Sequence, residues 1–244
     1  KEKLRALQYL YEYCIQNRIE DLELITFEQE RRFVECMLEK FPGKDLSKMS
    51  GIIESCRKIL FLHADHIHWH AQVWYLQRFH FTKERINPSK NIESISFLEI
   101  IHEQNKKYLK EYMRYVVGIT DMSVNNILYK FYDIRRLLLF FDQEDKDICE
   151  IADEKIHLYL EELRKKEVAE NTFNVQLFSI RHFFQFLLVK GHIRKIPFQY
   201  ELYQKKEIPV HHDRSVRDEV YKEILSKLYR FPEHLRLMFL HLWC

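Results

Sequence analysis

The sequence predicts an all-α protein. Only 4 glycines and 5 prolines occur in 244 residues, whereas folds rich in tight turns or parallel βα units need more of both. Apolar residues recur at helical spacing along most of the chain, and several of these stretches begin with a capping residue. With 46% hydrophobic, 14% aromatic and 31% charged residues, the chain can bury a core beneath a solvated surface.

Four helices are expected before residue 85. Thr26 and Gln29 have the spacing of a capping box, and Pro42-Gly43 ends the helix that follows. Asn87-Pro88-Ser89 then predicts a domain boundary or a long loop between Arg85 and Ser96. The expected helices cover Leu4 to Cys14, Phe27 to Phe41, Ser50 to Leu62 and the aromatic-rich stretch from Trp69 to Phe81.

A second helical block follows, with a clear stop signal at Gly191. Thr172 is expected to cap the last helix, Gly191 to take the left-handed position after it, and Pro197 to prevent continuation. A polar segment containing Pro209 then reads as an extended linker. The expected helices cover 97–117, 123–141, 153–166, 172–190, 216–229 and 233 to the end.

The two blocks show a weak internal similarity. Arg57 precedes the apolar run ILFL, and Arg181 precedes HFFQFLL 124 residues later. Two four-helix units in tandem are one interpretation, and chance similarity between helical bundles is the other.

Several classes of protein are excluded by motifs that the sequence lacks. The glycines at 43, 51, 118 and 191 stand alone, so neither a Rossmann fingerprint nor a P-loop is present, and no cofactor is expected. The five cysteines are scattered without a CxxC pair, which indicates a reduced, cytoplasmic chain. The charged N-terminal stretch is no signal peptide, and no apolar run approaches the ~20 residues of a membrane span.

The net charge of +2 is near zero, but acidic and basic residues are distributed unevenly along the chain. Residues 142–162 contain 9 acidic residues against 2 lysines, whereas residues 171–217 contain 8 basic residues against 3 acidic ones. Basic residues beside aromatic and amide side chains suit contacts to DNA phosphates, although lysines on helices also form ordinary solvated faces. The candidate DNA-binding residues are Lys130, Arg136, Arg181, Lys190, Arg194, Lys195, Lys205, Lys206 and Arg214.

Helical spacing predicts the surroundings of three of these candidates. Lys130 and Arg136 are expected to lie away from the apolar stripe of their helix. Arg181 falls at the edge of a core face, where it can brace a carboxylate or contact DNA. The acidic stretch is expected to face away from the DNA-binding residues, because carboxylates near phosphates repel them.

Histidines gather between His63 and His70, near Cys56. His66 and His70 would share one face of a helix, and imidazoles are good zinc ligands. No carboxylate or thiol stands at a recognised spacing, so packing and surface hydrogen bonds are the favoured interpretation and no metal is expected. His211-His212-Asp213 is interpreted as a solvated loop.

The segment from Thr172 to Phe198 closely resembles the last helix of the core-binding domain of tyrosine recombinases, the lambda-integrase family. The resemblance covers about 105–244 well and is weaker before that, and the order of its motifs is the specific part. The extra helical block before residue 100 is more typical of the larger transposon-encoded members of this family than of the short phage members. The matching residues are Thr172, Arg181, Phe183, Phe184, Leu187, Gly191, Ile193, Pro197 and Phe198.

The resemblance implies a division into four parts. Residues 1–95 form an N-terminal helical domain, 96–200 a SAM-like core-binding domain, 201–215 a basic linker, and 216–244 the first helices of a catalytic domain. The family's first catalytic arginine would follow Cys244, so no catalytic residue is assigned in this chain. The family's basic residues at the start of the last helix are replaced here by Val175 and Gln176.

The resemblance also implies a function in DNA integration and recombination. The expected partners are double-stranded DNA and other recombinase protomers bound to it. A helical protein–protein adaptor and a histidine-cluster metalloprotein remain the alternatives.

Overall fold

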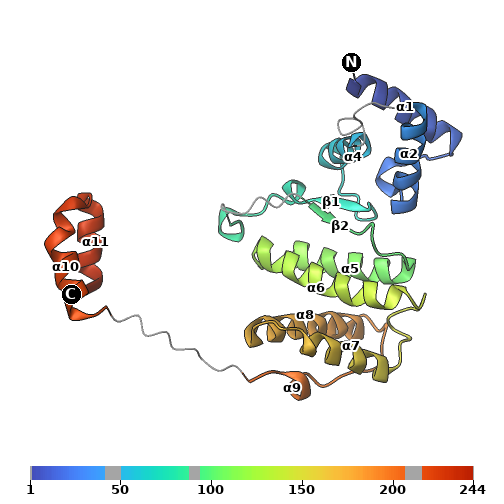
Figure 1. Ribbon diagram of the computed structural model, residues 1–244. Helices are drawn as coiled ribbons and strands as arrows, with labels where there is room; N and C mark the ends of the chain where they lie inside the picture. The colour runs from blue at the N-terminus through green and yellow to red at the C-terminus, as the bar shows by residue number, and fades with distance from the viewer. Residues whose placement is uncertain (1, 42–50, 88–93, 207–215, 244) are drawn as a thin grey trace. The chain divides into compact units, whose positions relative to one another are not determined.

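The computed structural model describes residues 2–41, 51–87, 94–206 and 216–243. The chain divides into two compact units, Lys1–Lys206 and Glu207–Cys244 (Figure 1). The first unit contains the N-terminal helices, a two-stranded sheet and a helical bundle, and the second contains a helical pair. The mostly helical architecture confirms the predicted all-α class.

Among the residues that the structure describes, three N-terminal helices surround a small core of their own. They are α1 (Glu2–Gln16), α2 (Phe27–Lys40) and α4 (Ile52–His63), with the 3₁₀ turn η1 (Leu22–Leu24) between the first two. The predicted capping box is confirmed, because the Thr26 hydroxyl accepts the Gln29 N–H and the Gln29 side chain accepts the Thr26 N–H. The core residues are Ala6, Leu10, Tyr13, Ile25, Phe33, Met37 and Ile53.

The predicted helix from Trp69 to Phe81 is wrong. This stretch forms strand β1 (Val73–Tyr75) and the 3₁₀ turn η2 (Leu76–Phe79), and a second turn, η3 (Lys83–Arg85), follows. Strand β1 pairs antiparallel with β2 (Ser94–Ser96), with Trp74 opposite Ile95. All three residues of β1 are buried, which an extended strand between two layers permits. The described residues of the first block, 2–41 and 51–87, therefore form three α-helices, with no α-helix at the fourth predicted position.

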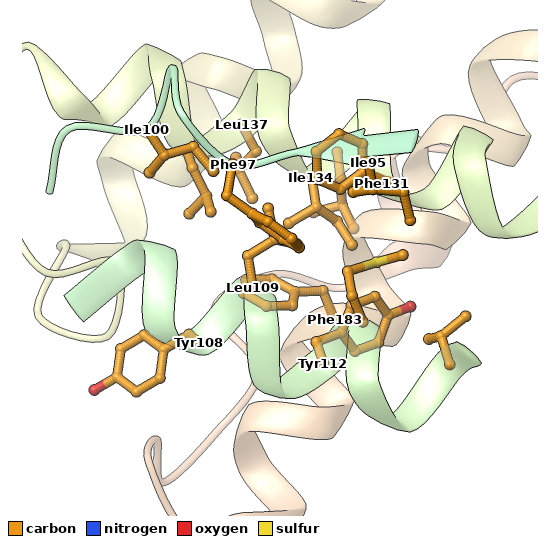
Figure 2. Close-up of a cluster of buried hydrophobic side chains, with 14 of the residues drawn as sticks. Ile95, Phe97, Ile100, Tyr108, Leu109, Tyr112, Phe131, Ile134, Leu137 and Phe183 are labelled. Atoms are coloured by element: carbon orange, nitrogen blue, oxygen red, sulfur yellow. The ribbon is translucent and has the colours of Figure 1, made fainter. Parts of the chain in front are cut away.

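The second block is a bundle of four long helices. They are α5 (Glu103–Ile119), α6 (Val124–Asp142), α7 (Asp153–Lys165) and α8 (Glu170–Val189), and α8 packs against each of the other three. Figure 2 shows the core where α5, α6 and α8 meet the segment after β2. Phe97 and Ile100 fill this core from a turn between β2 and α5. Helix α5 begins at Glu103 and not near Phe97 as predicted.

The C-terminal end of α8 follows from local sequence, whereas its predicted N-terminal cap is wrong. The helix begins at Glu170 after Ala169, so Thr172 lies inside the first turn. The stop signal is confirmed: Gly191 has a φ of +75°, its N–H donates to Leu188, and the His192 N–H donates to Leu187. These two bonds form a Schellman motif. The short helix α9 (Tyr200–Tyr203) then packs on α8, within the segment predicted to be extended.

The second unit consists of α10 (Asp218–Lys227), the turn η4 (Leu228–Arg230) and α11 (Glu233–Trp243). These elements match the predicted final pair of helices. A set of large apolar side chains remains exposed on them, namely Val220, Leu225, Tyr229, Phe231, Leu235, Leu237, Met238 and Leu240. Such a helical pair buries too little apolar surface to be stable alone.

Candidate nucleic-acid interface

Lys130 lies between α6 and α8, and the expectation that it avoids the buried face of its helix is wrong. The residue is only 6% exposed, and its Nζ has no hydrogen-bond partner among the described residues. The ammonium group lies 5.0 Å from the ring centroid of Phe178. Burial lowers the pKa of Lys130, and the nearby Asp133 carboxylate acts in the opposite direction.

Polar groups around Lys130 form a cluster where α5, α6 and α8 meet. Burial raises the pKa of Asp133, against the effects of Ser179, Arg136 and Lys130. The His182 Nδ1 and the Tyr112 hydroxyl are hydrogen-bonded at 2.8 Å. Burial and the charge of Lys130 lower the pKa of His182. These contacts make Lys130 a component of the helix interface.

Arg136 lies one turn beyond the cluster and reaches the surface. Its guanidinium Nη1 is 4.0 Å from Asp133 Oδ1, and its side chain is about half exposed. Of the two candidates predicted on α6, Arg136 is thus the one that solvent and a phosphate group can reach.

The end of α8 presents three of the predicted cations. Lys190 is exposed, with its Nζ 5.6 Å from the Phe186 ring centroid, and Arg194 is exposed just beyond the Schellman turn. Lys195 is 73% exposed and forms an ion pair with Asp153, the first residue of α7. Because Asp153 belongs to the acidic stretch, this contact is a departure from the expectation that the stretch faces away from the basic residues.

Arg181 forms an ion pair with a carboxylate, which is the first of its two predicted roles. Its Nη1 lies 3.6 Å from Glu201 Oε1, and its guanidinium stacks 5.3 Å from the Tyr200 ring centroid. These contacts hold α9 against α8.

The start of the predicted basic linker is docked on α8. The Asn174 side chain accepts the Lys205 N–H and donates to the Lys205 carbonyl, both at 2.9 Å. The Lys205 Nζ lies 4.9 Å from the Phe173 ring centroid, and Lys206 is exposed. Arg214 and the His211-His212-Asp213 segment lie outside the described residues.

The histidine-rich segment has a structural explanation. Helix α4 ends at His63, so His66 and His70 do not share a helical face. His68 pairs with the buried Glu23, and His70 lies 3.9 Å from Asp21. In the described ranges, no three His, Cys, Asp or Glu side chains are placed to hold a metal ion. The four cysteines that the structure describes are free thiols.

One basic surface of the structure was not among the sites predicted from the sequence. Helix α5 carries Lys106, Lys107, Lys110 and Arg114, and these residues line a hollow of about 380 Å³ with Trp69 and His70. Three of the cations are spaced four residues apart, which is the signal that could have located them.

Most of the helical bundle matches the model of a known protein family. Residues 109–191, which run from α5 to the glycine after α8, match the phage integrase N-terminal SAM-like domain. Comparison with curated proteins and with solved structures gives no significant match. Within the described part of the chain, no helix has both the length and the apolar character needed to cross a bilayer. Residues 109–191 are therefore similar to the N-terminal SAM-like domain of phage integrases.

Proposed function

We propose that this chain is the double-stranded DNA-binding part of a site-specific tyrosine recombinase. The match of 109–191 to the integrase SAM-like domain carries this proposal. The exposed cations at the end of α8 support it, because Lys190 and Arg194 follow the domain's last helix without a carboxylate partner among the described residues. Cations of this kind neutralise phosphates and release counterions.

The geometry divides the predicted contact residues into three groups. Arg136, Lys190, Arg194 and Lys206 are exposed and are proposed as direct phosphate contacts. Lys195, Arg181 and Lys205 already have intramolecular partners, and we propose that Lys195 exchanges Asp153 for a phosphate. Lys130 is proposed to fix α8 against α6, and Arg214 remains a proposed contact from the sequence alone.

The activity of the complete recombinase is proposed from the family resemblance. In that family a tyrosine breaks and rejoins DNA without a metal or an external energy source. We propose that the protein acts in this way within a mobile element, with several protomers assembled on the DNA. The second unit, Glu207–Cys244, would begin the catalytic domain, which explains its exposed apolar side chains.

The first experiment is a gel-shift series with the 244-residue chain and duplex DNA. If about six phosphates are contacted, affinity should fall by ~10³ or more between 50 and 200 mM salt. A suicide substrate should remain uncleaved, because no catalytic residue is assigned here. Binding that does not depend on salt, or nicking of the substrate, contradicts the proposal.

A protein–protein adaptor is the second candidate, and one observation favours it. Helix α1 exposes the apolar residues Leu4, Leu7, Tyr11 and Ile15, and three of them line a hollow of about 510 Å³. An adaptor without a nucleic-acid role predicts that the chain binds no duplex at moderate salt. A zinc content that survives dialysis would instead favour the histidine-cluster alternative.

A further inference from the structure

A second basic surface lies along α5 and consists of residues other than those predicted to bind DNA. It is a hollow of about 380 Å³ between the α5 side chains and the segment that leads into β1, called the α5 groove below. Most of the lining precedes residue 109, where the matched family domain begins. The lining residues are Trp69, His70, Glu103, Lys106, Lys107, Lys110, Glu111 and Arg114.

Three of the four cations of the α5 groove repel one another along their own helix. Lys106, Lys110 and Arg114 are four residues apart, so they lie on one face of α5, with Lys107 beside them. Like charges at this spacing repel and destabilise a helix by a few tenths of a kcal/mol per pair. Their arrangement therefore favours a role in binding something negative.

The α5 groove remains positive after its carboxylates are counted. Glu103 pairs with Lys106 at 2.8 Å, and Glu111 lies 3.5 Å from His192. In the parts of the chain that the structure describes, no carboxylate lies within 4.0 Å of the cationic groups of Lys107, Lys110 or Arg114. Three cationic groups are thus available to an anion.

Two of these cations are held in place by the segment before β1. The Lys110 Nζ donates to the His70 carbonyl at 2.6 Å, and the Arg114 guanidinium stacks 5.2 Å from the Trp69 ring centroid. Trp69 is itself fixed, because its ring lies 5.0 Å from that of Trp74 and 5.4 Å from that of Phe79. Side chains ordered in advance lose less entropy when a ligand binds.

The floor of the α5 groove also carries charge. The Lys106 side chain is 5% exposed, and its only partner within ion-pair distance among the described residues is the largely exposed Glu103. A buried ammonium group with one solvated partner gains from a further anion nearby.

We propose that the α5 groove binds the phosphodiester backbone of duplex DNA, as a contact additional to those proposed above for Arg136, Lys190, Arg194 and Lys206. The proposal rests on the DNA-binding function proposed above. From Lys107 to Arg114 the helix rises ~10 Å, which corresponds to about three nucleotides of one strand at ~3.4 Å each. Because the groove offers ammonium and guanidinium donors, the contact would position the protein on DNA of any sequence.

The test is fluorescence anisotropy of the chain with a labelled duplex between about 50 and 200 mM salt. The variant Lys107→Gln with Arg114→Gln removes two exposed cations and leaves the buried side chains of α5 intact. Affinity should fall on the order of tenfold at about 150 mM salt, and the salt slope should decrease by about two. The matched control is Lys3→Gln with Arg5→Gln, two exposed cations on α1, which should change affinity less than about twofold.

A second variant tests the opposite direction. Glu103→Gln removes the partner of Lys106 and makes the α5 groove more positive, so duplex affinity should rise. The proposal is overturned if the Lys107/Arg114 variant keeps the wild-type slope while the wild type binds DNA, and an acidic protein partner would then be the ligand to test. If the wild type does not bind duplex at all, the proposed function fails and this inference fails with it.

Discussion

The Lys110 Nζ donates a hydrogen bond of 2.6 Å to the backbone carbonyl of His70, which joins α5 to the turn before β1. This contact places a cation in partly desolvated surroundings. Burial lowers the pKa of Lys110 to about 8, the charge of Lys106 acts in the same direction, and Glu103 opposes both. Burial therefore disfavours the charge of the Lys110 amine, whereas the His70 carbonyl gives this amine a hydrogen-bond acceptor.

Lys110 should make the stability of the chain depend on pH above neutrality. Between pH 8 and its ordinary pKa of 10.5, the unfolded chain holds the Lys110 proton more often than the folded chain does, so raising the pH favours folding. Between about pH 7 and 9.5, the free energy of unfolding of the wild type should gain on the order of 1 kcal/mol relative to Lys110→Met. Urea titrations at both pH values measure this difference. The control is Lys107→Met, an exposed position on the same helix. This variant keeps Lys110, so its free energy of unfolding should rise with pH as that of the wild type does.

Gly191 should be the most substitution-sensitive glycine among those that the structure describes. Its φ of +75° disfavours any residue with a Cβ, although a Cβ there would meet nothing within 4 Å. Gly191→Ala should therefore destabilise the first unit by about 1 kcal/mol through backbone strain, and Gly191→Asn by less. Gly118→Ala is the matched control. It lies inside α5 with equal space around it and should be neutral or stabilising. Equal effects of the two alanine substitutions in thermal unfolding would contradict the Schellman assignment.

Arg57 should be essential to the N-terminal helices. The residue is 2% exposed, donates to the carbonyls of Leu22 and Ile25, and pairs with Glu30. Arg57→Met would leave these acceptors without their donor and should cost about 3–5 kcal/mol in the free energy of unfolding. Arg31→Met breaks only exposed ion pairs on α2 and should cost less than about 1 kcal/mol. Chemical denaturation followed by circular dichroism separates these outcomes, and similar costs would show that the buried network contributes little.

Local signals in the sequence predicted the ends of several elements correctly. Thr26 with Gln29 ahead of α2, and Gly191 after α8, each act within a few residues, so no knowledge of the fold was needed. The stretch from Trp69 to Phe81 was mispredicted because the partner of β1, the strand Ser94–Ser96, lies far along the chain. Helical periodicity cannot represent a contact over that distance.

The candidate site was less predictable than the fold, and Lys130 shows why. Spacing along α6 suggested a solvated lysine, but α8 covers that side of the helix through Phe178. The packing of a second helix determines which side of an amphipathic helix is covered. The periodicity of the first helix alone does not define that packing. The α5 groove could not be predicted for the same reason. Trp69 and His70 line it only because the segment before β1 folds against α5.

Lys205 and Lys206, at the start of the basic linker, should contribute to DNA affinity without contributing to sequence preference. Asn174 fixes the backbone of Lys205, so both lysines project from a defined position beside α8. If they bind phosphates, Lys205→Ala with Lys206→Ala should weaken binding to all duplex sequences about equally and lower the salt slope by about one for each phosphate that is no longer bound. Lys206→Ala alone separates the effect of charge from that of the Lys205–Phe173 packing.

The structure also determines which acidic residues make a valid comparison for this lysine pair. Asp147 accepts hydrogen bonds from the Tyr108 hydroxyl and the Cys149 N–H, so replacing it would disturb the fold. Asp145→Asn with Glu150→Gln changes two exposed carboxylates instead, and binding should be unchanged or slightly tighter. Anisotropy at several salt concentrations compares the two double variants. If the acidic pair controls affinity while the lysine pair has no effect, the basic linker does not contact the duplex and serves only to join α8 to the second unit.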